Sequence, residues 1–121
     1  MILSFKKQFE RPIIHGTKIH TIREDKHDRW KAGNIIHFAT GVRTKDYNQF
    51  MVGQCKSVQH ICITNNAGGG TWCRIDGKYH GGIFVAQNDG LTFDDFINWF
   101  IPKQGDKFEG KIIHWTDFKY Q

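Results

Sequence analysis

Three polar side chains with chemical potential lie close together in the first fifth of the chain. Lys18, Thr21 and Arg23 fall within six residues, shortly after Gly16, a residue type that commonly ends a helix. A lysine that is partly desolvated, or that lies beside an arginine, has a lowered pKa and can act as a base or polarise a carbonyl. A threonine hydroxyl can serve as a nucleophile or as a hydrogen-bond donor. The segment therefore predicts a small polar pocket for an anionic or carbonyl oxygen; a solvated strand edge is the alternative.

The position of Lys18 relative to the following strand decides whether this pocket can form. Residues 19–23 alternate in the manner of a strand, which places Ile19, Thr21 and Arg23 on one face and Lys18 on the other. Lys18 and Thr21 share a pocket only if Lys18 lies in the turn before the strand. Gly16 makes such a turn feasible, because glycine adopts left-handed backbone conformations without a steric penalty.

Other chemistries find little support in the sequence. There is no nucleophile elbow of the G-x-S-x-G type, no H-E-x-x-H, no C-x-x-C pair and no lysine after the glycine-rich residues 68–70, so Ser hydrolase, zinc and P-loop sites are not expected. His20, His37 and His114 fall at strand positions and are interpreted as structural residues. Neither a metal nor a cofactor is expected. The three cysteines are interpreted as reduced thiols in a cytoplasmic protein.

The distribution of charge favours an anionic partner. Residues 1–60 carry eleven Lys and Arg against five acidic residues, whereas residues 61–121 carry six against seven, so the first half holds the whole net charge of +5. A basic face attracts phosphate, and aromatic residues among basic ones can stack on bases. The candidates for stacking are Trp30, Tyr47, Phe50, Trp72 and Tyr79; core packing is the alternative for each.

The elements that must position these residues predict an α+β fold that is mostly β. Strands are expected at residues 2–5, 19–23, 35–40, about 51–64, 71–75 and 108–115, with a glycine-rich tip at 65–70 and a hairpin turn at Asp76-Gly77. Helices are expected at 9–15, shortened by Pro12, and at 92–100, where Thr92 can cap a stripe of large apolar residues. About six strands and two or three short helices predict a small β-barrel.

The length of 121 residues, without linker or repeat, predicts one domain over residues 1–121. The chain has neither an apolar run long enough to span a bilayer nor a signal peptide, so we expect no membrane association and a cytoplasmic location.

The pattern Gly16-x-Lys18-x-x-Thr21-x-Arg23, followed by an acidic loop and by Trp30-Lys31-x-Gly33-Asn34-x-Ile36, resembles the signature of the ASCH domain. This family is related to the PUA RNA-binding fold. The resemblance covers most of the chain and implies a PUA-like barrel with a cleft beside the motif.

One bacterial branch of the family that this chain resembles is an amidohydrolase that removes acetate from N4-acetylcytidine. It uses the motif Lys, the motif Thr and a downstream Glu. By position, the resemblance implies catalytic roles for Lys18, Thr21 and Asp89, the last being one methylene shorter than the family's Glu. Lys18 would activate Thr21 or a water, Arg23 would orient a substrate oxygen, and Asp89 would carry a proton to the leaving amine.

Two non-catalytic functions remain open for the same cleft. In an RNA-binding module, Lys18, Arg23, Arg29 and Arg43 would contact phosphates while an aromatic residue such as Trp30 stacks on a base. In a nucleotide-sensing domain, the cleft would bind a small ligand without turnover. The expected partner is a modified nucleoside or RNA, and no obligatory protein partner is inferred.

Overall fold

The computed structural model describes residues 1–66 and 70–121. In chain order its elements are β1 (Ile2–Phe5), the 3₁₀ helix η1 (Lys7–Phe9), α1 (Glu10–His15), β2 (His20–Arg23), β3 (Ile35–Thr40), β4 (Asn48–Gln54), β5 (Ser57–Asn66), β6 (Gly70–Ile75), β7 (Lys78–Gly81), α2 (Gly82–Asn88), α3 (Phe93–Phe100) and β8 (Lys107–His114). The protein is therefore α+β and mostly β, as expected. Part of the predicted tip at 65–70 lies outside the described residues.

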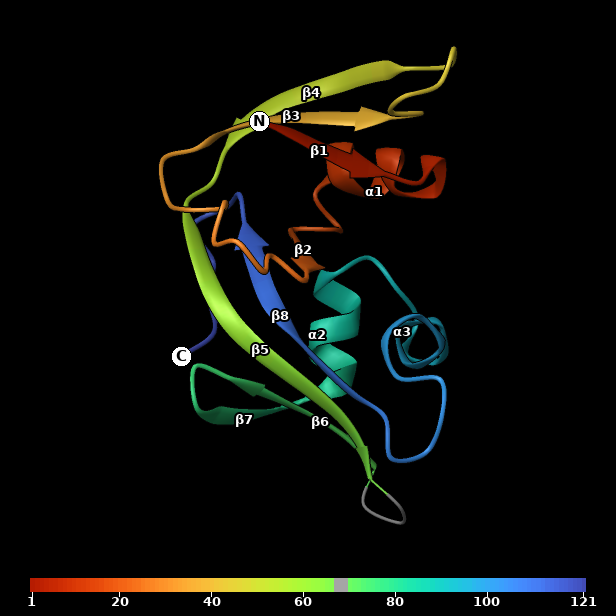
Figure 1. Ribbon diagram of the computed structural model, residues 1–121, viewed down its shortest axis with the longest axis vertical. Helices are drawn as coiled ribbons and strands as arrows, with labels where there is room; N and C mark the ends of the chain where they lie inside the picture. Colours follow the sequence, from red (N-terminus) through yellow and green to blue (C-terminus); the bar gives the residue numbers. More distant parts are fainter. Residues whose placement is uncertain (67–69) are drawn as a thin grey trace.

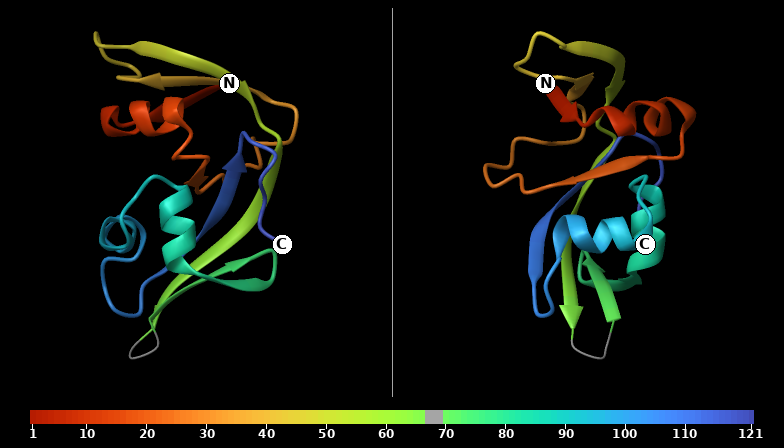
Figure 2. Two further views of the ribbon diagram at one scale, coloured as in Figure 1. Left: turned by 180° about the vertical axis from the view of Figure 1, so that it is seen from behind. Right: turned by 90° about the vertical axis from the view of Figure 1, so that its right-hand side faces the viewer.

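The described strands form two sheets and no closed barrel. One sheet has the order β1-β3-β4, and the other has the order β2-β8-β5-β6-β7. Among the pairings of the described strands, only that of β1 with β3 is parallel. Figures 1 and 2 show the smaller sheet at one end of the molecule beside α1, and the larger sheet at the other end beside α2 and α3. The expected barrel closure is thus not confirmed.

The strand expected at about 51–64 is two strands, because the chain changes its pairing partner in the middle. Gln54 still pairs with Ile35 of β3, whereas Ser57 pairs with His114 of β8. Between them, Cys55 exchanges backbone hydrogen bonds with the turn at residues 33–34. This change of partner links the two sheets, and with β7 it raises the strand number from the expected six or so to eight.

The core explains why the two helices predicted from the sequence form. In α3, Thr92 is the N-cap and its hydroxyl accepts a hydrogen bond from the Asp95 amide at 3.2 Å. Phe96 is fully buried, and the other apolar members of the stripe, Phe93, Ile97 and Phe100, pack against the core. Helix α1 ends at His15, and the next residue, Gly16, caps it with a left-handed φ of 82°. Both predictions are confirmed; α2 was not expected from the sequence.

None of the helices in the described part of the chain has the length and apolar character needed to cross a bilayer.

We predict that Gly110→Ala destabilises the protein. Gly110 lets β8 lie close to Arg23, the last residue of β2, beside the pocket. A Cβ at this position would lie 2.5 Å from the carbonyl oxygen of Arg23 and 2.8 Å from the Phe108 ring. Overpacking of this kind costs about 1–3 kcal/mol of unfolding free energy, which urea denaturation measures. Gly81→Ala is the matched control, since its Cβ would meet only the Phe84 ring at 3.7 Å. Equal stabilities for the two variants would contradict the prediction.

Candidate functional site

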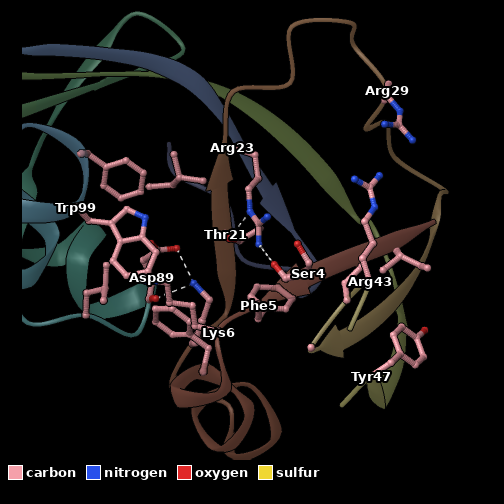
Figure 3. Close-up of a pocket in the computed structure, with 18 residues that line it drawn as sticks. Ser4, Phe5, Lys6, Thr21, Arg23, Arg29, Arg43, Tyr47, Asp89 and Trp99 are labelled. Carbon is pink, nitrogen blue, oxygen red and sulfur yellow. Dashed lines mark hydrogen bonds and ion pairs between the residues drawn. The ribbon is translucent and has the colours of Figure 1, made fainter. Parts of the chain in front are cut away.

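The main pocket lies between the two sheets and has a volume of about 1110 Å³. Its walls come from β1, η1, the turn after α1, β2, the loops between β2 and β3 and between β3 and β4, the residues after α2, and α3. Figure 3 shows Asp89 and Trp99 at one end, Thr21 and Arg23 in the middle, and Arg29, Arg43 and Tyr47 at the other end. Most residues that the sequence singled out therefore share one cavity, although they come from distant segments.

The turn after α1 places Lys18 in this pocket. Beyond Gly16, the amide of Lys18 donates to the carbonyl of Pro12 at 3.0 Å, and Lys18 forms an isolated antiparallel bridge with Asp89. Strand β2 begins only at His20, two residues later. Lys18 thus precedes the strand, as its joint use with Thr21 requires, and both residues line the cavity.

Lys18 and Asp89 form a buried ion pair. The Lys18 ammonium donates to the Asp89 carboxylate Oδ1 at 2.9 Å and to the Asp89 carbonyl at 2.7 Å, and each residue is only 2–3% exposed. The ammonium also lies 4.8 Å from the centroid of the Phe9 ring. Desolvation lowers the pKa of Lys18 below its ordinary value, although the Asp89 charge opposes this effect. A lysine in this position gives up its proton more readily than a surface lysine.

Gly90 allows the lysine side chain to lie against the backbone. A Cβ at this position would lie 3.0 Å from Cβ and 3.3 Å from Cγ and Cδ of Lys18, and the φ of Gly90 is +78°. Both the space and the backbone conformation therefore favour glycine next to Asp89.

Arg23 holds the hydroxyl of Thr21. Its Nε donates to Thr21 Oγ1 at 3.2 Å, another guanidinium nitrogen donates to the carbonyl of Ser4, and the guanidinium carbon lies 5.1 Å from the Phe5 ring centroid. Thr21 is 4% exposed. No hydrogen bond joins Lys18 to Thr21 within the described residues. A positive charge thus lies beside a hydroxyl oxygen at the pocket wall, an arrangement that stabilises negative charge developing there.

A second polar layer, missed in the sequence, supports Asp89 from behind. His20 is fully buried; its Nδ1 lies 3.2 Å from Asp89 Oδ1 and its Nε2 lies 2.8 Å from the Tyr120 hydroxyl. The side-chain amide Nδ2 of Asn88 donates to the same hydroxyl at 3.0 Å. Because a carboxylate only accepts, Nδ1 is the donor to Asp89, and the tautomer with its proton on Nδ1 leaves Nε2 to accept from the Tyr120 hydroxyl. Burial raises the pKa of Tyr120, so its hydroxyl keeps the proton that it donates.

The side chain of Gln59 fixes Tyr120 in this position. Its amide nitrogen donates to the Tyr120 carbonyl at 2.9 Å, and its oxygen accepts from the Tyr120 amide at 2.9 Å. The same oxygen is 2.9 Å from Nε2 of the buried His114. Desolvation lowers the pKa of His114 to about 4, and the neighbouring His20 contributes to this effect. His114 is therefore neutral at pH 7 and donates to Gln59.

The remaining expected site residues divide into two groups. Arg29 and Arg43 lie on the pocket wall, and so does Tyr47, one of the candidates for stacking on a base. Trp30 lies outside the described lining of the pocket and packs partly buried against the core, while its amide donates to Asp25. Lys6 and Trp99 also line the pocket, with the Lys6 ammonium 4.9 Å from the Trp99 ring centroid. Neither residue belongs to a motif in the sequence, so neither was predicted to lie at the site.

Among the described residues, no group of three His, Cys, Asp or Glu side chains is arranged to hold a metal ion. All three cysteines are free, and burial raises the pKa of Cys73 to about 12, so this thiol stays protonated.

Comparisons of the chain with protein-family models, with curated proteins and with solved structures found no match.

We predict that Tyr120→Phe lowers stability by about 1–3 kcal/mol, because it leaves the buried His20 ring and the half-buried Asn88 side chain without their shared partner. Urea denaturation followed by circular dichroism measures the loss. Tyr79→Phe is the matched control, since Tyr79 is 68% exposed. The prediction fails if both variants are as stable as the wild type.

We also predict that His114 makes the protein less stable as the pH falls from about 6.5 to about 4. In this range the unfolded chain, with an ordinary histidine pKa of 6.5, binds a proton that the folded protein excludes. Stability should therefore fall by about 1–2 kcal/mol between pH 7.5 and 5 on account of this residue. Urea denaturation at both pH values should show a smaller pH dependence in His114→Gln than in the wild type. An unchanged pH dependence would exclude this role.

Proposed function

We propose that this protein is an amidohydrolase that removes the acyl group from an N4-acylated cytidine such as N4-acetylcytidine. The observation that carries the proposal is the buried pair of Lys18 and Asp89 in the same pocket as Thr21 and Arg23. The ASCH signature supports it, because these are the positions at which the amidohydrolase branch has its catalytic residues. On this proposal the two sheets are a variant of the PUA-like scaffold.

On this proposal Thr21 is the nucleophile, because Arg23 holds its hydroxyl in the pocket that Lys18 also lines. In its neutral form Lys18 takes the proton of the Thr21 hydroxyl as Thr21 Oγ1 attacks the acetyl carbonyl carbon. The resulting oxyanion is stabilised by Arg23, whose guanidinium is already fixed by Ser4 and Phe5. A fixed cation needs no reorganisation when the charge appears.

Collapse of this intermediate completes the first half of the reaction. Lys18, supported by Asp89, returns the proton to N4 of the base, the C–N bond breaks and cytidine leaves. Water then adds to the acetyl ester on Thr21 with Lys18 as the base, acetate leaves, and the hydroxyl regains its proton. The overall balance is one amide and one water to one amine, one acetate and one proton that passes to solvent.

The ion pair needs Asp89 in one orientation, and the layer of His20 and Tyr120 supplies it. With Oδ1 bonded to both Lys18 and His20, the carboxylate cannot rotate freely. An aspartate held in this way can take the place of the longer glutamate of the family.

Substitution of Thr21 is the cleanest test, because Thr21→Val keeps the shape and leaves the ion pair intact. We expect wild-type protein to release cytidine from N4-acetylcytidine and Thr21→Val to be slower by on the order of 10²–10⁴-fold. Thr21→Ser keeps the hydroxyl and should retain turnover. Chromatography with mass detection measures the cytidine formed. Full activity of Thr21→Val would exclude Thr21 as the nucleophile and leave a water in that role.

Lys18→Ala and Asp89→Asn should each abolish release of cytidine. Removal of one partner of a buried pair also destabilises a fold by about 3–5 kcal/mol, so circular dichroism must show that each variant is folded at the assay temperature. Unchanged turnover in both folded variants would overturn the amidohydrolase proposal. Binding of the nucleoside to wild-type protein without turnover would do the same, and would support the nucleotide-sensing alternative.

A further inference from the structure

The pocket extends well beyond the residues that the proposed reaction needs. Its volume of about 1110 Å³ exceeds the roughly 300–1,000 Å³ of typical small-molecule sites. In Figure 3, Arg29, Arg43 and Tyr47 surround the end of the pocket opposite Asp89. This end has no role in the proposed cleavage of the amide. Its residues can therefore bind another part of the same ligand.

The charges around the pocket are strongly unbalanced. The lining includes Lys6, Arg23, Arg29 and Arg43 in addition to the Lys18–Asp89 pair, and Asp89 is its only acidic member among the described residues. Since the pair is neutral as a unit, four positive charges remain. A neutral nucleoside would leave them uncompensated, whereas a phosphate carries negative charge and several acceptor oxygens.

The acidic residues nearest to Arg29 in sequence are occupied elsewhere. Asp25 accepts from the amides of Arg29 and Trp30, and both Asp25 and Asp28 pair with Lys111 of β8. The backbone of Arg29 is held on both sides, since its carbonyl also accepts from Asn34 at 3.0 Å. The loop is thus anchored, while the guanidinium takes part in none of the ion pairs within the described residues.

Arg43 is presented by a tight turn between β3 and β4. The carbonyl of Gly41 accepts from the amide of Thr44 at 3.0 Å and from its hydroxyl at 2.7 Å. Gly41 has a φ of +63°, and a Cβ there would lie 2.5 Å from the carbonyl oxygen of Asp46, so the turn requires glycine. Arg43 itself has a φ of +65°, which is uncommon for any residue other than glycine. The turn holds Arg43 in this conformation at the pocket, again without an acidic partner among the described ion pairs.

We propose that Arg29 and Arg43 form a phosphate subsite, and that the substrate is a phosphorylated nucleoside, either a free nucleotide or a nucleotide residue within RNA. Two guanidinium groups from separate loops can bind different oxygens of one phosphate, for which arginine is well suited. The identity of the base rests on the proposed function; the phosphate subsite does not, because it can be measured by binding alone.

The experiment is calorimetric titration of the protein with cytidine and with cytidine 5′-monophosphate. We expect wild-type protein to bind the monophosphate at least tenfold more tightly, with a preference that decreases as salt is added. The double variant Arg29→Gln/Arg43→Gln should lose most of this preference, with a much smaller effect on cytidine. Lys45→Gln is the matched control, because Lys45 is an exposed cation in the same loop but outside the described pocket lining.

Equal affinities of wild-type protein for the two ligands, or binding of neither, would overturn the phosphate subsite, as would an equal loss of preference in Lys45→Gln. The acylated substrates then distinguish the two proposals. If N4-acetylcytidine is turned over and a 5′-phosphate does not improve binding, the phosphate subsite is contradicted but the amidohydrolase is not. If the phosphate improves binding and no substrate is turned over, the amidohydrolase is contradicted but the subsite is not. If acetate is released faster from N4-acetylcytidine 5′-monophosphate than from a trinucleotide containing N4-acetylcytidine, the phosphate belongs to a free nucleotide. The reverse order would identify RNA as its source.

Discussion

Burial of the Lys18 ammonium is the constraint on which the rest of the site depends. Removing a charge from water costs several kcal/mol even in a real protein interior, unless a partner and hydrogen bonds compensate. Here the compensation is the carboxylate and the carbonyl of Asp89, both at the end of α2. The turn after α1, the glycine at position 90 and the layer behind Asp89 all keep these atoms in reach of the ammonium. The orientation of the Lys18–Asp89 pair and the stability of the fold therefore depend on the same few contacts.

The parts of the fold that were predictable from the sequence are those fixed by local contacts. The cap at Thr92, the apolar stripe of α3 and the stop at Gly16 are each decided within a few residues. The division of the strand at Cys55 was not predictable, because an apolar pattern continues across it while the pairing partner changes. Helix α2 was missed for a different reason: it follows β7 directly, and its large apolar residues Ile83 and Phe84 are exposed instead of forming a buried stripe.

The site divides in the same way. Lys18, Thr21 and Arg23 are close in sequence, so their spacing predicts a shared pocket, and the one condition attached to Lys18 is met by the turn. Asp89 was predicted as a site residue only because the chain resembles the ASCH family. His20 was interpreted as a structural histidine, which describes its burial but not its contact with the carboxylate. Tyr120 carried no signal, because its role depends on a contact between residues 100 positions apart in the chain.

That contact has a consequence for the order in which the protein assembles. Closing a loop of this length is entropically costly, and contacts of large sequence separation form late and slowly in folding. The carboxylate of Asp89 acquires its support only when the segment carrying Tyr120 has docked onto Gln59 of β5. A partly folded chain, or one still leaving the ribosome, can contain every strand beside the pocket and still hold Asp89 loosely. The orientation of Asp89 thus depends on the docking of the segment that carries Tyr120, and not only on the strands beside the pocket.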